Sequence, residues 1–326
     1  VAIGASTAAA PDRLQLALRG SGQALYVGLA DDAYIVASEP YGVVEETARY
    51  IRMDGETPGN LQNPNASRGQ ILELDANLAG RLDGILRKAY DGTDLPVDEA
   101  DVSVAQITTR DIDRGDHPHY LMKEIGEAPT SFRKTLRGKI IETPEGPRVT
   151  LDHEIVPENV RLGLRDGSIA RVLVVGQGTA AVAGQSLAAA LQALIPSGEV
   201  HAEAILATEL SGFGLQSDMA DTLIVAVSQS GTTTDTNRTV DIVRNRGAKI
   251  IAIVNRRGSD LTDRADGVLY TSDGRDVEMS VASTKAFYAQ IAAGLLLAVT
   301  IADEVLGDEG AADRRQLVSE IIAMPE

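Results

Sequence analysis

Short apolar segments and helix-like segments alternate strictly along the chain from residue 171 onward. The segment 223–227 is apolar at every position, which is typical of a strand buried on both faces of a sheet. Strands of this kind, joined by helices, form parallel sheets covered on both sides. We therefore predict an α/β domain with a five-stranded, doubly wound parallel sheet. The expected strands are 172–175, 199–202, 222–227, 249–254 and 268–271, and the expected helices are 180–194, 206–210, 236–246, 260–264 and 283–305.

The first third of the chain has a different pattern, with short apolar runs separated by turn residues. Two such runs flank the Asp31-Asp32 pair, which predicts an antiparallel hairpin over 24–38. Apolar residues at helical spacing predict a helix over 78–90. Further strands are expected at 45–52 and 70–74.

A polar segment with Gly and Pro, 113–119, separates this part from a further helix over 121–136. We expect Pro129 to kink or split that helix, and we place the domain boundary near residue 110. His117 and His119 stand two residues apart without a third ligand, so we expect solvent-exposed side chains here and no metal site.

Composition excludes several classes of function. With 30 Lys and Arg against 47 Asp and Glu, the formal net charge is −17, so no nucleic acid or anionic membrane is expected as a partner. There are no cysteines, which excludes disulfides, thiolate metal sites and a cysteine nucleophile. The apolar run 289–302 is shorter than the roughly 20 residues of a membrane span, so it predicts a buried helix.

The expected strand 222–227 ends in a loop rich in hydroxyl groups, 228–234, before a helix begins. Unpaired N–H groups at a helix N-terminus attract anions, and a serine- and threonine-rich loop adds donors. Gly231 allows close approach of the backbone. The loop therefore predicts a phosphate cradle, although such clusters also cap helices for purely structural reasons.

Two further loops leave the sheet or open a helix in a similar way. The first, 176–180, has two glycines as a dinucleotide-binding loop does, but position 181 is Ala and no acid follows the second strand as that motif requires. The second, 280–287, opens the long apolar helix, with Ser283 as the N-cap or its neighbour. Lys285 near that helix start indicates either a ligand or an ion pair with an acid such as Glu278.

The segments 223–236 and 281–287 together resemble the first sugar isomerase (SIS) domain of the isomerising glutamine–fructose-6-phosphate aminotransferase family. Residues 119–125 are similar to the junction between the glutaminase and isomerase halves of that family, and 22–56 resemble the tail of its glutaminase domain. The resemblance is weak over about 60–108, where the chain carries extra residues.

The resemblance implies three parts. Residues 1–110 correspond to the C-terminal part of a class II glutamine amidotransferase domain, with a partial α+β fold of the Ntn hydrolase type. Residues 111–150 are a linker with the leading helix of the isomerase half, and 151–326 are the first SIS domain. The family makes glucosamine 6-phosphate from fructose 6-phosphate and ammonia released from glutamine.

Position by position, the resemblance also implies the residues of a sugar-phosphate site. It assigns no catalytic residue, metal or cofactor to this stretch, and the implied ligand is fructose 6-phosphate or glucosamine 6-phosphate. The phosphate-binding residues are Ser228, Gln229, Ser230 and Thr233, the first-loop residue is Thr179, and the sugar-lining residues are Val281, Ala282 and Ser283.

Several positions depart from the family pattern. Gln177 and Ala180 stand where the family commonly has Cys and Ser, and Thr232 replaces a usual Glu. The family's catalytic N-terminal cysteine is absent and Val1 cannot replace it, because the front of the glutaminase domain is missing. The chain ends at Glu326, before the second SIS domain with its Schiff-base lysine.

We therefore expect this stretch to bind a sugar phosphate without turning it over alone. The first interpretation is part of a longer cytoplasmic aminotransferase that pairs as a homodimer. A non-catalytic or diverged SIS-domain sensor of sugar phosphates is the alternative. A nucleotide-binding protein using 176–180 is a third interpretation.

Overall fold

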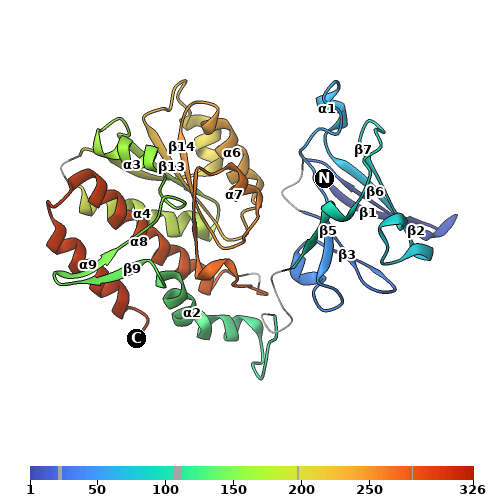
Figure 1. The fold of residues 1–326 in the computed structure, drawn as a ribbon, viewed down its shortest axis with the longest axis horizontal. Coiled ribbons are helices and arrows are strands. Elements are labelled where there is room, and N and C mark those ends of the chain that lie inside the picture. Colours follow the sequence, from blue (N-terminus) through green and yellow to red (C-terminus); the bar gives the residue numbers. More distant parts are fainter. Residues whose placement is uncertain (21–23, 106–111, 197, 281) are drawn as a thin grey trace. The chain divides into compact units, whose positions relative to one another are not determined.

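The structure is a computed structural model, and it describes residues 1–20, 24–105, 112–196, 198–280 and 282–326. The chain divides into two compact units, Val1–Asp113 and Arg114–Glu326 (Figure 1). Each unit contains its own hydrophobic core.

Two four-stranded antiparallel sheets make up the first unit, with strand orders β1-β2-β6-β7 and β4-β3-β5-β8. One core is shared by both sheets, because Leu16 and Leu72 from the first contact the same cluster as Val27 and Ile51 from the second. The strands are β1 (Ala2–Thr7), β2 (Ala10–Leu18), β3 (Tyr26–Leu29), β4 (Tyr34–Ala37), β5 (Arg49–Arg52), β6 (Gln70–Asp75), β7 (Ile85–Ala89) and β8 (Val102–Val104), and the one described α-helix is α1 (Pro64–Ser67).

The hairpin expected over 24–38 is confirmed, since β3 and β4 pair antiparallel. The helix expected over 78–90 is wrong, because this stretch forms short 3-10 turns followed by strand β7. Gly80 has a φ of +77°, and a Cβ there would lie 1.9 Å from the carbonyl oxygen of Ala30. The backbone must turn at Gly80, and β7 then pairs with β6 instead of coiling.

The second unit begins with helix α2 (Tyr120–Leu136), which continues through Pro129 and is not split. Pro129 removes the donor for the carbonyl of Ile125. Ile125 is 58% exposed, so water can satisfy that carbonyl. A hairpin of β9 (Ile140–Thr143) and β10 (Gly146–Val149) and helix α3 (Glu158–Arg165) follow.

The predicted five-stranded parallel sheet is confirmed, with the order β12-β11-β13-β14-β15. Its strands are β11 (Arg171–Gly176), β12 (His201–Leu206), β13 (Thr222–Ser228), β14 (Lys249–Val254) and β15 (Gly267–Tyr270). The helices are α4 (Thr179–Leu194), α5 (Ala207–Glu209), α6 (Thr234–Arg244), α7 (Asp260–Arg264), α8 (Lys285–Leu306) and α9 (Ala311–Ala323), with a π-helical turn, η5 (Leu210–Gly214), after α5.

Helices cover both faces of this sheet (Figure 1). Alternate residues of β13 enter different cores: Leu223 and Val225 pack with α4 and α8, whereas Ile224 packs with α6 and α7. Every residue of β13 is buried. This double burial explains why the strand is apolar at successive positions.

Helix α8 is the longest helix of the second unit and is strongly apolar. By length and composition it is the single helix, among the described residues, that could cross a membrane, but it is mostly buried against its neighbours. It contacts α2, α3 and α4. The prediction of a buried helix over 289–302 is therefore confirmed.

Candidate functional site

A cavity of about 250 Å³ opens at the C-terminal ends of β11 and β13. The chain order of the strands reverses between these neighbours, because β12 follows β11 on one side and β13 lies on the other. Ligands of open α/β sheets bind at such a point. The cavity is lined by Gln177, Thr179, Ala180, Val227, Ser228, Gln229, Ser230, Thr233, Glu278, Ser280, Ser283 and Gln290.

The loop after β13 is held in shape by its own hydroxyl groups. The Oγ of Ser228 accepts a hydrogen bond from the backbone N–H of Gly231 at 3.0 Å, and the Oγ of Ser230 accepts one from Thr232 at 3.2 Å. Gly231 has a φ of +66°, and a Cβ there would lie 2.0 Å from the Oγ of Ser259. Glycine is therefore required for both the backbone conformation and the space.

Two helices begin at this cavity without a side-chain cap. Helix α6 starts after Thr233, and α4 starts after Gly178, and neither N-cap residue makes a side-chain hydrogen bond to the helix. The first N–H groups of a helix have no partner within it and carry partial positive charge. The cavity therefore offers neutral donors for an anion.

A third helix, α8, begins beside the same cavity but has a cap. The Oε1 of Glu278 accepts hydrogen bonds from the backbone N–H groups of Thr284 at 2.7 Å and Ala286 at 3.0 Å. The negative carboxylate occupies the positive end of this helix. An anion is consequently favoured at α4 and α6, and the side near Glu278 suits neutral hydroxyl groups.

The partner suggested for Lys285 is wrong. Its Nζ lies 2.5 Å from Oε2 of Glu127 on α2, and Glu278 instead binds the backbone at the start of α8. Lys285 is only 5% exposed and does not line the cavity. Its position near a helix N-terminus therefore reflects a partly buried ion pair between α8 and α2.

Six of the eight residues assigned from the sequence line this one cavity. Ala282 does not line it, and Val281 lies outside the described residues. The residues brought together are Thr179, Ser228, Gln229, Ser230, Thr233 and Ser283.

Gln290 and Glu278 are cavity residues that were not assigned from the sequence. Gln290 is 3% exposed, and its Oε1 has no hydrogen-bond partner within the described structure. It lies on α8, and Ser283 lies just before the start of that helix, so the same segment brings both side chains to the cavity. A buried amide oxygen without a partner carries a free-energy cost, and in this position it is available to a molecule in the cavity.

No group of three or more His, Cys, Asp or Glu side chains positioned for a metal ion occurs in the part of the chain that the structure describes. His117 and His119 are both exposed.

Comparison with known proteins adds the family context. Residues 168–300 match the SIS domain family. The isomerising glutamine–fructose-6-phosphate aminotransferase of Corynebacterium diphtheriae is 31% identical over 320 residues, which cover 97% of this chain and 44% of that protein. The enzyme of the same name from Leifsonia xyli subsp. xyli is 35% identical over 305 residues, covering 93% of this chain and 43% of that protein.

Among solved structures, the C-terminal domain of glucosamine-fructose-6-phosphate aminotransferase from Francisella tularensis has a TM-score of 0.54 at 24% identity. The match covers 65% of this chain and 56% of that chain, and it supports the fold.

The sheet order and the family match define an α/β protein with a SIS domain. Over nearly its whole length the chain is related to the isomerising glutamine–fructose-6-phosphate aminotransferases. It spans less than half the length of these relatives.

Proposed function

We propose that the second unit binds the sugar phosphate of a glutamine-dependent aminotransferase that makes glucosamine 6-phosphate from fructose 6-phosphate. In this proposal the first unit is the C-terminal part of the glutaminase domain. The relatives that carry this enzyme name match both units, since the match reaches 97% of the chain. The cavity beyond β11 and β13 is the proposed binding site.

The observation that carries the proposal is the pair of uncapped helix N-termini, α4 and α6, at one hydroxyl-lined cavity. No Lys or Arg is among the described residues that line it. A phosphate would therefore be bound by N–H groups, helix dipoles and the hydroxyls of Ser230 and Thr233. Neutral donors of this kind suit a chain with a net charge of −17.

The sugar would extend from the phosphate toward α8. Ser283 and Gln290 provide a hydroxyl and an amide on that side, and Glu278 provides carboxylate oxygens. These groups hydrogen-bond to sugar hydroxyls and attract no second phosphate. The arrangement fits a molecule with one anionic end and one polyol end.

The cavity by itself has little means of acid–base catalysis. Glu278 is the ionisable side chain among its described lining residues, and its Oε1 already accepts three hydrogen bonds from Thr284 and Ala286. We propose that the residues that move the proton and carry the amino group come from other parts of the enzyme.

The same observation favours a second candidate, a sensor that binds a sugar phosphate without converting it. The two candidates differ in turnover. The protein isolated at its natural length, supplied with ammonia and fructose 6-phosphate, forms an amino sugar if the aminotransferase proposal is correct. Tight binding of fructose 6-phosphate with no amino sugar formed would favour the sensor.

The binding step itself is tested by calorimetry with three ligands. Fructose 6-phosphate is expected to bind, whereas fructose and NAD are expected to show no heat of binding at the same concentrations. Binding of NAD with no binding of fructose 6-phosphate would overturn the proposal and favour a dinucleotide site at 176–180.

A further inference from the structure

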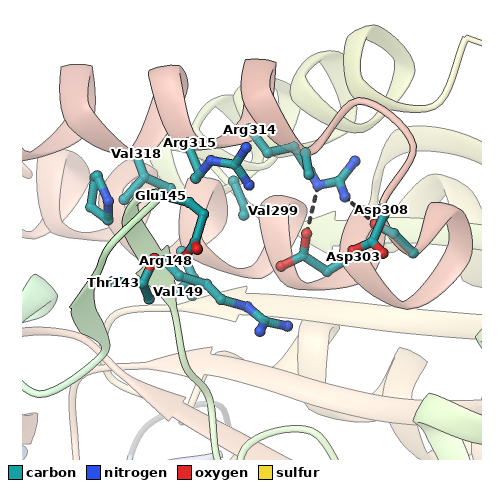
Figure 2. A pocket seen from close by; sticks show the side chains of 13 residues that line it. Thr143, Glu145, Arg148, Val149, Val299, Asp303, Asp308, Arg314, Arg315 and Val318 are labelled. Carbon is teal, nitrogen blue, oxygen red and sulfur yellow. Dashed lines mark hydrogen bonds and ion pairs between the residues drawn. The ribbon is translucent and has the colours of Figure 1, made fainter.

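A second cavity of about 320 Å³ lies in the same unit, between the β9–β10 hairpin, the end of α8 and the start of α9 (Figure 2). It shares no lining residue with the cavity at the sheet edge. Its volume is in the range of small-molecule sites. The lining includes three arginines, Arg148, Arg314 and Arg315, and three acids, Glu145, Asp303 and Asp308.

One arginine and one acid of this cavity neutralise each other. The Nε of Arg314 donates to Asp303 at 2.6 Å, and its other nitrogens donate to the carbonyls of Gly307 and Glu309 (Figure 2). Arg314 is 3% exposed. It therefore joins α8 to α9, binds the negative end of α8, and has no remaining role for a ligand.

The side chains of the other two arginines have no hydrogen-bond or ion-pair partner among the described residues. Arg148 extends from β10 and Arg315 from α9, and neither guanidinium has a hydrogen bond or ion pair to any described residue (Figure 2). The stem of Arg315 passes close to the hairpin, because a Cβ added at Gly146 would lie 3.6 Å from its Cδ. Guanidinium groups bind phosphate or carboxylate through paired hydrogen bonds.

Two acids of the cavity also have no ion-pair partner among the described residues. Glu145 accepts one hydrogen bond, from the hydroxyl of Thr143 at 3.1 Å, and the carboxylate of Asp308 has no partner among the described residues. Neither forms an ion pair with Arg148 or Arg315, although all four line the same cavity. A ligand with only negative charge would be repelled by these carboxylates. A ligand with one negative and one positive group would pair with the two arginines and with the two acids.

We propose that this cavity binds a small zwitterion, whose phosphate or carboxylate contacts Arg148 and Arg315 and whose ammonium group contacts Glu145 and Asp308. Amino sugar phosphates and free amino acids both have this chemistry. The site joins the hairpin to α8 and α9, and α8 also lines the sugar-phosphate cavity through Gln290. The proposal does not depend on the function assigned to that cavity.

Hydrogen–deuterium exchange tests the site locally, with glucosamine 6-phosphate and glutamate as the zwitterionic probes. Glucose 6-phosphate is the matched probe that lacks the ammonium group. At least one zwitterion is expected to slow exchange in peptides covering 140–149 and 307–318. Glucose 6-phosphate is expected to need at least a ten-fold higher concentration for the same protection. Protection by glucosamine 6-phosphate would identify the ligand as an amino sugar phosphate, and protection by glutamate would identify it as a free amino acid.

Three variants complete the test. Arg148→Gln with Arg315→Gln is expected to abolish this protection, and Glu145→Gln is expected to remove the preference for the zwitterion. Lys249→Gln, which removes a cation that lines neither cavity, is the control and is expected to change nothing. Neither arginine side chain has a partner among the described residues, so the melting temperature of the variant is expected to be unchanged, which would show that it is folded.

Protection by glucose 6-phosphate equal to that by glucosamine 6-phosphate would overturn the proposal, as would protection that survives loss of both arginines. No protection by either zwitterion at millimolar concentration would also overturn it.

Discussion

The Oε1 of Glu278 accepts two hydrogen bonds from Thr284, one from the backbone N–H at 2.7 Å and one from the hydroxyl at 2.9 Å. These bonds cap α8, the central helix of the second unit. They also explain why this helix start differs from those of α4 and α6. The helix ends without a cap are the ones available to a ligand.

Replacing Glu278 by alanine should destabilise the second unit. The N–H groups at the start of α8 would lose their acceptor, and loss of an N-cap costs about 0.5–2 kcal/mol. Glu278→Gln keeps an oxygen acceptor and should lose less. Urea unfolding followed by circular dichroism measures both, and equal stability of Glu278→Ala and the wild type would refute the capping role.

Replacing Gln290 by methionine should separate binding from stability. Its buried Oε1 has no partner in the described structure, so an apolar side chain of similar size should leave the free energy of unfolding unchanged or raise it. Affinity for fructose 6-phosphate should fall about ten-fold, the effect of one lost hydrogen bond of roughly 1.5 kcal/mol. Calorimetry and urea unfolding of the same variant measure the two effects. A loss of stability without a loss of affinity would show that Gln290 is structural.

The first unit should lose stability in acid through Asp54. Burial alone would raise the pKa of Asp54, but hydrogen bonds from Thr57 and Glu56 to the carboxylate outweigh it and hold the pKa below the ordinary 3.8. Because the folded pKa is depressed, the stabilisation is present above pH 3.8 and is lost as the pH falls through the folded value.

Asp54→Asn is the variant that tests this pH dependence. It should lower the free energy of unfolding at pH 7 by about 1 kcal/mol, and the difference from the wild type should shrink below pH 4. Urea unfolding at several pH values provides the measurement. A difference that stays constant between pH 7 and pH 3 would contradict the assignment.

The sequence predicted the parallel sheet because its signals are local. The residues of β13 are apolar at every position, and the loop after it contains its own donors and its own glycine. The same local signals predicted Ser230 and Thr233 as hydroxyl donors, and both line the cavity. Chain order and sheet geometry then bring this loop next to Thr179.

Contacts between distant segments could not be predicted in this way. The turn at Gly80 is required by the carbonyl of Ala30, fifty residues earlier, and nothing near residue 80 specifies that neighbour. Lys285 pairs with Glu127 across 158 residues, although Glu278 is much closer in the sequence. In both cases the contact is determined by packing between elements that are distant in the sequence. The spacing of nearby residues does not predict such a contact.

The central claim is that the loop after β13 binds the phosphate of a sugar phosphate, and calorimetry with fructose 6-phosphate tests it most directly. Ser230→Ala with Thr233→Ala removes two hydroxyl donors from the cavity. The control is Ser186→Ala with Ser319→Ala, whose hydroxyls bond only to carbonyls of their own helices. We predict a loss of affinity of about a hundred-fold or more in the first variant and none in the control. Unchanged affinity in Ser230→Ala with Thr233→Ala would contradict the account.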